Sequence, residues 1–153
     1  MDAIDAEIQQ EFPSVVRGGF QRWSDETDEY NCIAFAAGDF TQWWWPVGKK
    51  WTTRLRSARD AYWPPSCPRE VTIQAFICAS ATLGYSPCAD GTVETGYEKV
   101  ALYVDAGKVP THAARQTPSG KWASKLGDSW DIEHTQHLSE YGSVEQFLKR
   151  PIS

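Results

Sequence analysis

Apolar side chains recur at helical spacing through much of the first half of the chain. Cys32, Phe35 and Ala36 lie at i, i+3 and i+4, which predicts a buried helix that begins at the cysteine. Asn31 is a suitable N-cap for this helix, and Gly84 supplies a stop signal for the last one. The predicted helices cover residues 2–12, 31–40, 50–63 and 69–83.

The pattern changes after Gly91, where runs of apolar and β-branched residues indicate strands. A turn at 117–120 joins the last two strands into an antiparallel meander. The remainder, from about residue 131, is predicted to be helical or irregular and to cover one edge of the sheet. Helices first and strands later predict an α+β fold in a single domain spanning residues 1–153. The predicted strands are 99–104, 109–116 and 121–127.

Composition excludes several classes of function. The formal net charge of -5 argues against attraction to a nucleic-acid backbone. The basic residues from Lys49 to Arg59 are interpreted as the solvated face of the helix predicted there. No apolar stretch approaches the roughly 20 residues that a membrane-spanning helix needs. We therefore expect neither nucleic acid nor membrane as a partner, and we expect no cofactor.

The segment 1–12 is acidic and polar, unlike a secretory signal, so we expect a cytoplasmic protein or one secreted without a signal peptide. The four cysteines contain no C-x-x-C pair, and they are expected to be reduced thiols that hold no zinc. His134 and His137 would share a helical face beside Glu133. We interpret them as surface residues and expect no metal site.

Two residues could carry chemistry together. Cys32 lies where unpaired backbone N–H groups at the start of a helix lower a thiol pKa and favour thiolate. His112 lies near the start of a predicted strand, among small alanines. A helix-opening cysteine followed some eighty residues later by such a histidine is typical of a nucleophile and its base. Each residue alone is also compatible with a structural role.

Four passages from residue 31 onward resemble small bacterial papain-like cysteine peptidases: NCIAFA at 31–36, GYEKVALY at 96–103, THAARQ at 111–116 and WASKLG at 122–127. The resemblance implies a cysteine at a helix N-terminus packed on a small antiparallel sheet. It also implies that a Cys32–His112 thiolate–imidazolium pair cleaves protein substrates, with the backbone N–H of Cys32 as oxyanion donor. Related folds act instead on peptidoglycan peptides or on glutamine side chains.

A third polar residue usually orients the histidine in the papain pattern, and here neither Asn nor Asp stands at the expected place. If the turn at 117–120 pairs the flanking residues, Ser124 falls on the same sheet face as His112 and is our choice. A dyad without a third member is also compatible with the sequence. The other candidates are Gln116, Glu98, Asp128 and Asp131.

Some proteins similar to this one are toxins that bacteria deliver into competitors through contractile, type VI secretion systems. At least some of these cleave type II topoisomerase ATPase subunits. The resemblance therefore suggests an interbacterial effector whose producer carries an immunity protein that covers the active site. The alternative of another class is a catalytically silent binding module, in which an aromatic patch such as Trp43 to Trp45 docks a partner.

Overall fold

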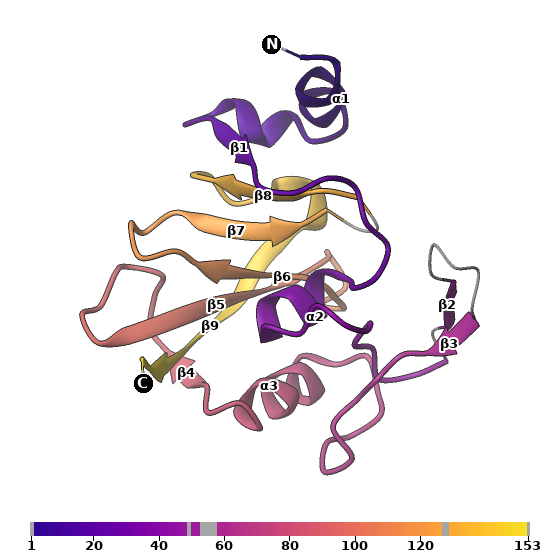
Figure 1. Cartoon of the computed structure of the whole chain (residues 1–153). Helices are drawn as coiled ribbons and strands as arrows, with labels where there is room; N and C mark the ends of the chain where they lie inside the picture. The colour runs from indigo at the N-terminus through magenta and orange to yellow at the C-terminus, as the bar shows by residue number, and fades with distance from the viewer. Residues whose placement is uncertain (1, 49, 53–57, 127–128, 153) are drawn as a thin grey trace.

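The computed structural model describes residues 2–48, 50–52, 58–126 and 129–152, and it shows an α+β fold (Figure 1). The helices are α1 (Ala3–Glu11), α2 (Cys32–Ala37) and α3 (Ile73–Ala81), with 3-10 turns η1 (Pro13–Val16) and η2 (Ser139–Tyr141). The strands are β1 (Phe20–Arg22), β2 (Lys50–Thr52), β3 (Ala58–Asp60), β4 (Ser86–Cys88), β5 (Tyr97–Val104), β6 (Pro110–Gln116), β7 (Trp122–Lys125), β8 (Asp131–His134) and β9 (Ser143–Pro151).

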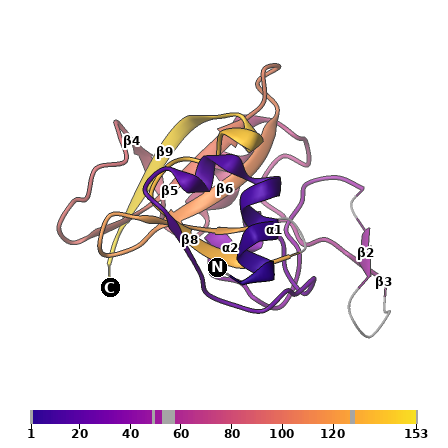
Figure 2. The same cartoon turned by 90° about the horizontal axis from the view of Figure 1, so that it is seen from above.

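Seven of these strands form one antiparallel sheet in the order β1-β8-β7-β6-β5-β9-β4. β5 to β8 are the predicted meander with one strand added, and β9 returns along β5 before β4 closes that edge. β2 and β3 form a separate two-stranded ribbon. Figure 2 shows this ribbon standing off to the side of the main sheet.

The two faces of the sheet carry separate cores, because successive residues of a strand point to opposite faces. We call the face covered by α2 and α3 the front face; α2 lies across β6 and β7 in Figure 1. The sheet residues of the front core include Val100, Leu102, Ala113 and Ala123. On the opposite, back face, the core combines sheet residues with the N-terminal segment: Ala101, Tyr103, Ala114, Trp122 and Ile132 with Ile8 and Val15.

The predicted cap of α2 is confirmed. The side chain of Asn31 accepts a hydrogen bond from Ala34 N at 3.1 Å, as an N-cap does. The same side chain also binds the backbone of Trp44, donating to its oxygen at 2.9 Å and accepting from its nitrogen at 3.1 Å. Gly38 ends the helix in the left-handed conformation at φ 81°, so α2 is shorter than predicted.

The helix predicted at 50–63 is wrong, and so is the helical or irregular structure predicted from residue 131. The segment 50–63 contains β2 and β3, and Tyr62 extends the strand-like pairing by bonding its backbone to Trp43 and Trp45. Lys50 and Arg59 therefore lie in strands and not on a helix, and Lys49, Arg54 and Arg56 lie outside the described residues. The segment from residue 131 forms β8, η2 and β9, because both strands find partners in the main sheet. In both segments, strand pairing in the tertiary structure outweighed the helical spacing of the apolar residues.

A disulfide joins Cys67 to Cys78, with their Cα atoms 5.7 Å apart. The expectation of four reduced thiols is therefore wrong for this pair. The bridge ties the proline-rich connector before α3 to the helix itself, which fixes α3 against the front face. Cys32 and Cys88 carry thiols. In the part of the chain that the structure covers, no helix has the length and apolar character to cross a membrane.

Candidate functional site

Cys32 is the first residue of α2, as predicted from the sequence. Its side chain is 8% exposed and belongs to the front core, together with Ala113 and Ala123 of the sheet. The two alanines leave room for the helix to approach β6 and β7 closely. Cys32 therefore lies between α2 and the front face of the sheet.

His112 lies on the back face. It is opposite Tyr103 in the β5–β6 register, and the two rings are 5.0 Å apart. The imidazole also stacks on the ring of Tyr141 at 4.1 Å, with 3° between the planes. Tyr103 and Tyr141 both belong to the back core, and His112 is only 1% exposed. The histidine is a core residue of the face that α2 does not cover.

The sheet therefore separates the predicted catalytic pair, and this is a correction to the sequence analysis. Ala113, the residue after His112, faces α2, and strand alternation turns His112 the other way. Bringing the imidazole to Cys32 would require a one-residue shift of β6, which would move every side chain of that strand to the opposite face. A Cys32–His112 ion pair therefore has no geometric support, whereas the oxyanion role of the Cys32 backbone N–H stays a prediction.

Ser124, in contrast, does lie beside His112. Thr117 N bonds Lys121 O at 2.8 Å, so the turn has the assumed pairing. The Ser124 Oγ lies 3.0 Å from His112 Nε2 and 2.8 Å from His134 Nε2. We call these three residues the back-face network; all are at most 1% exposed.

One carbonyl sets the proton positions throughout the back-face network. His134 Nδ1 lies 2.6 Å from the oxygen of Gln136, so Nδ1 carries the proton and Nε2 accepts from the Ser124 hydroxyl. Ser124 Oγ then accepts from His112 Nε2–H, which leaves His112 Nδ1 as a buried lone pair without a hydrogen-bond partner. The network is satisfied by neutral imidazoles, apart from that one atom.

Burial keeps both imidazoles uncharged. It lowers the pKa of His112 well below its ordinary value of 6.5, with a further contribution from His134. Burial also lowers the pKa of His134 to about 4, although its bond to Gln136 acts in the opposite direction. The network ties β6, β7 and β8 together and does not meet solvent.

The other predicted partners of His112 are engaged elsewhere. Gln116 Nε2 donates to Gly91 O at 2.6 Å, and Glu98 accepts from Arg150. Asp131 binds Tyr30 on the front side, while Asp128 lies outside the described residues. None of the described candidates is bonded to the imidazole.

The remaining sequence candidates also have structural contacts. His137 Nδ1 lies 3.2 Å from the Tyr103 hydroxyl, and neither it nor His134 is on a helix, so the predicted shared helical face is wrong. Trp43 and Trp44 donate from their indole nitrogens to Asp28 O and Asp39 Oδ2. Within the described ranges, no group of three His, Cys, Asp or Glu side chains could hold a metal ion.

A buried charged cluster fixes the segment that leads into α2. Lys125 is 0% exposed and donates to the carbonyls of Thr27 and Ser129, with its Nζ 4.9 Å from the centre of the Tyr30 ring. Tyr30 donates its hydroxyl proton to Asp131. Burial raises the pKa of both Tyr30 and Asp131, so the phenol stays protonated. This cluster holds the chain before α2 against β7 and β8.

An open cleft of about 350 Å³ lies beside this cluster. Trp23 and Phe40 form its exposed walls, at 50% and 48% exposure. Arg115 is half-buried at the cleft and makes no hydrogen bond or ion pair with any described residue. Its register partners on β5 and β7 are Val100 and Ala123. The residues that line the cleft are Trp23, Ser24, Phe35, Phe40, Arg115, Gln116, Thr117, Pro118, Ala123 and Asp131.

Arg115 was not predicted as a site residue from the sequence. The sequence did contain an indication of its role. Strand alternation places Arg115 on the same face of β6 as Ala113, and the small side chain of Ala113 lets α2 pack closely there. A charged residue at such a position, with apolar cross-strand neighbours, is not explained by core packing. Trp23 and Phe40 gave no signal, since they reach the cleft from loops.

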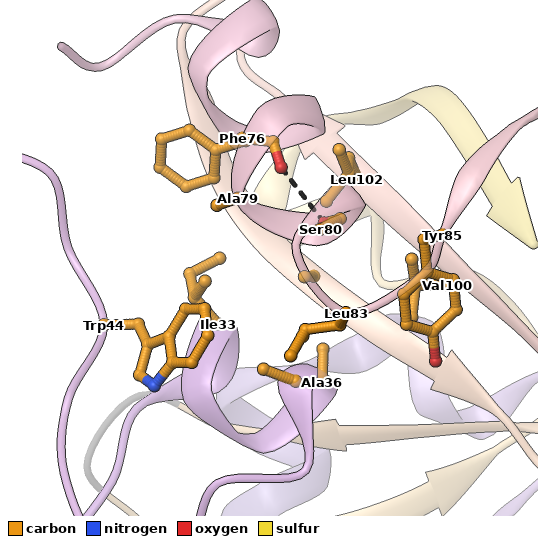
Figure 3. Close-up of a pocket in the computed structure, with 12 residues that line it drawn as sticks. Ile33, Ala36, Trp44, Phe76, Ala79, Ser80, Leu83, Tyr85, Val100 and Leu102 are labelled. Atoms are coloured by element: carbon orange, nitrogen blue, oxygen red, sulfur yellow. Dashed lines mark hydrogen bonds between the residues drawn. The ribbon is translucent and has the colours of Figure 1, made fainter. Parts of the chain in front are cut away.

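A second hollow on the front face is part of the core. It lies between α2, α3 and β5, and its volume of about 20 Å³ is close to that of a single water-sized probe. Figure 3 shows apolar side chains around it, including Ile33, Phe76 and Leu102. The hydroxyl of Ser80 is bonded to Phe76 O at 3.0 Å. This is a packing gap and not a ligand site.

The protein therefore has an α+β fold built on one main sheet. The helix that begins at Cys32 lies on one side of this sheet, and the buried histidine–serine network lies on the other. The chain belongs to the family described as "Domain of unknown function (DUF7689)", whose model matches residues 21–149. No curated protein and no solved structure matches the chain. The matched range contains α2, the cleft and the back-face network.

Proposed function

We propose that this domain is a binding module that holds a small ligand in the front-face cleft. The observation that carries the proposal is the cleft itself, in which aromatic walls meet a guanidinium that forms no hydrogen bond or ion pair with the described residues. Ligand sites are typically concave and mostly apolar, with a few polar groups that fix orientation, and have volumes of about 300–1,000 Å³. A cleft of about 350 Å³ with this lining meets that description.

The walls of the cleft are held in place before any ligand arrives. Phe40 packs edge-on against Tyr30 and Phe35, with ring centres 5.2 and 5.7 Å apart. The loop that carries Phe40 is fixed by Asp39, whose carboxylate accepts hydrogen bonds from Thr41, Gln42 and Trp44. A site whose walls are already ordered loses less conformational entropy on binding.

Fragment screening tests this function directly. Amide chemical shifts of ¹⁵N-labelled protein should move on addition of small aromatic fragments, and the largest changes should fall at residues 23–24, 35–40 and 115–118. Phe40→Ala should weaken the binding. Ile152→Ala, at a site 59% exposed and outside the cleft, should not. Shifts scattered over the surface, or gathered at another hollow, would contradict the proposal.

A thiol hydrolase is the second candidate, and one observation favours it. Cys32 lies on the same face as the cleft, and Phe35, one turn further along α2, lines the cleft. Such an enzyme would resemble the papain-like peptidases in its nucleophile, but its base would have to be a residue other than His112. Under this second candidate, we propose that the protein cleaves protein substrates as a peptidase and acts as an interbacterial effector.

Incubation with a bacterial lysate distinguishes the two candidates. A hydrolase should generate new protein fragments that disappear after alkylation of the protein and in Cys32→Ala, while His112→Gln should retain the activity. Toxicity of the wild type in an unprotected host, lost in Cys32→Ala, would support the effector role. A binding module should give no fragments and no difference in growth between wild type and Cys32→Ala.

A further inference from the structure

We propose that the cleft selects ligands that combine an aromatic ring with a carboxylate. This inference rests on the binding function proposed above and adds the class of ligand. It starts from the charges around the cleft. Arg115 contributes a positive charge in a protein whose formal net charge is -5. A cation at a concave site in an otherwise acidic protein favours an anionic ligand.

No described side chain forms a hydrogen bond or ion pair with Arg115, although the guanidinium interacts electrostatically with Tyr85, as Arg150 and Glu98 also do. Its partners in the register, Val100 and Ala123, are apolar. Glu133 lies across from Ala123 on the next strand and forms no ion pair with the guanidinium. A half-buried guanidinium has five donors, and a ligand anion could occupy them.

Asp131 also lines the cleft, and its carboxylate is engaged through one oxygen only, because Oδ1 is buried without a hydrogen-bond partner among the described residues. One carboxylate oxygen accepts from Tyr30, and the nearby Lys125 ammonium interacts with it electrostatically. Asp131 therefore interacts with Lys125, and no ion pair joins it to Arg115. Among the described lining residues, Arg115 is a cation without an ion-pair partner, which suits a ligand with one negative charge.

A carboxylate fits this site better than a phosphate group. A planar guanidinium binds a carboxylate through two parallel hydrogen bonds. A phosphate monoester carries about -1.5 to -2 charges near neutral pH and commonly needs further cations or the amides of a helix N-terminus. Arg115 is the one Lys or Arg among the described residues that line the cleft. The aromatic half of the ligand is selected by Trp23, Phe35 and Phe40, whose rings can pack against it.

Titration calorimetry of the whole protein tests this selection with four probes: 3-phenylpropionate, the neutral 3-phenylpropanamide, the cationic 3-phenylpropylamine and phenylphosphonate. We expect 3-phenylpropionate to bind about ten-fold more tightly than the amide, as a charge-assisted bond predicts. Arg115→Gln should remove that preference, so that 3-phenylpropionate and the amide bind with similar affinity. Arg115→Lys keeps the positive charge but cannot form the two parallel hydrogen bonds of a guanidinium, so it should retain part of the preference.

The matched control is Arg69→Gln, which removes the same charge from an exposed position away from the cleft and should keep the full preference. Equal affinity for propionate and amide, with shifts still at the cleft, would overturn the carboxylate inference and leave the binding function standing. Tighter binding of phenylphosphonate would overturn it in favour of a phosphate-like ligand. If no fragment moves the cleft amides, the binding function itself fails.

Discussion

The front and back faces of the sheet use polar residues in opposite ways. On the back face, His112, Ser124 and His134 are sealed in the core and satisfy one another. On the front face, Arg115 is half-buried at an open cleft, and no residue in the described part of the chain forms a hydrogen bond or ion pair with it. The comparison teaches that a histidine beside a serine is not by itself a catalytic arrangement. A functional site differs from a structural network in two ways: solvent can reach it, and it has a polar group without a hydrogen-bond partner in the protein.

Loss of the central hydroxyl should have the largest effect on stability. Ser124→Ala leaves the two facing nitrogens of His112 and His134 buried without partners, so we expect a loss of about 2–4 kcal/mol in the free energy of unfolding. Urea denaturation measures it. Ser66→Ala, at an exposed position, is the control. A loss below about 1 kcal/mol would mean that the network contributes little to the fold.

Removal of the Cys67–Cys78 bridge should have the next largest effect, and it should act on the front face. The double variant Cys67→Ser with Cys78→Ser frees a short loop, and a bridge of this span stabilises by about 2–3 kcal/mol. Hydrogen exchange should rise in α3 and remain slow in β6 and β7. Equal loss of protection on both faces would show that the two cores unfold as one unit.

Acid should weaken the back face before the front. The pKa values of His112 and His134 are lowered in the folded protein, so the unfolded chain binds protons more readily below its ordinary histidine pKa of 6.5. The contribution of these neutral histidines to the free energy of unfolding should be fully present above that pH. It should fall by up to about 1.4 kcal/mol per pH unit per histidine as the pH drops toward 4.

Urea midpoints at pH 7.5, 6.5 and 5.5 measure this slope. The variant His134→Gln should show a smaller slope, because one histidine with a lowered pKa is gone while His112 and His137 remain. An unchanged slope in that variant would assign the acid sensitivity to other groups.

The smallest expected effect concerns the thiol. Since the sheet lies between the two residues, His112→Gln should change the rate at which iodoacetamide labels Cys32 by less than about two-fold. Peptide mass spectrometry of the folded variant measures this rate. A strong slowing would show that the imidazole does act on Cys32, and it would restore the thiolate–imidazolium pair.

Strong local signals in the sequence predicted much of the fold. The N-cap at Asn31, the helices near α1, α2 and α3, and the strands β5 to β7 were all found from spacing and caps. The segment 50–63 was missed, because a few apolar residues at helical spacing can also sit in two short paired strands. The register that places Ser124 beside His112 followed from the turn at 117–120.

The face on which His112 lies could not be predicted. Strand alternation groups His112 with Ala114, and Ala113 with Arg115, but it does not say which group a helix will cover. Both faces of β6 carry an alanine, so residue size does not indicate which face α2 packs against. The sequence pattern therefore predicted the Ser124 contact correctly and the Cys32 contact wrongly.

The pairing of β1 with β8 bears on how fast the protein folds. Phe20 is registered with His134, and Trp23 N bonds Asp131 O at 2.8 Å, so segments more than one hundred residues apart must meet. Closing so long a loop is slow, and β-rich folds with such contacts often need milliseconds to seconds. Because Trp23 lines the cleft, we expect the cleft to form late. Pulsed hydrogen exchange should protect the amide of Trp23 after those of the hairpin β5–β6.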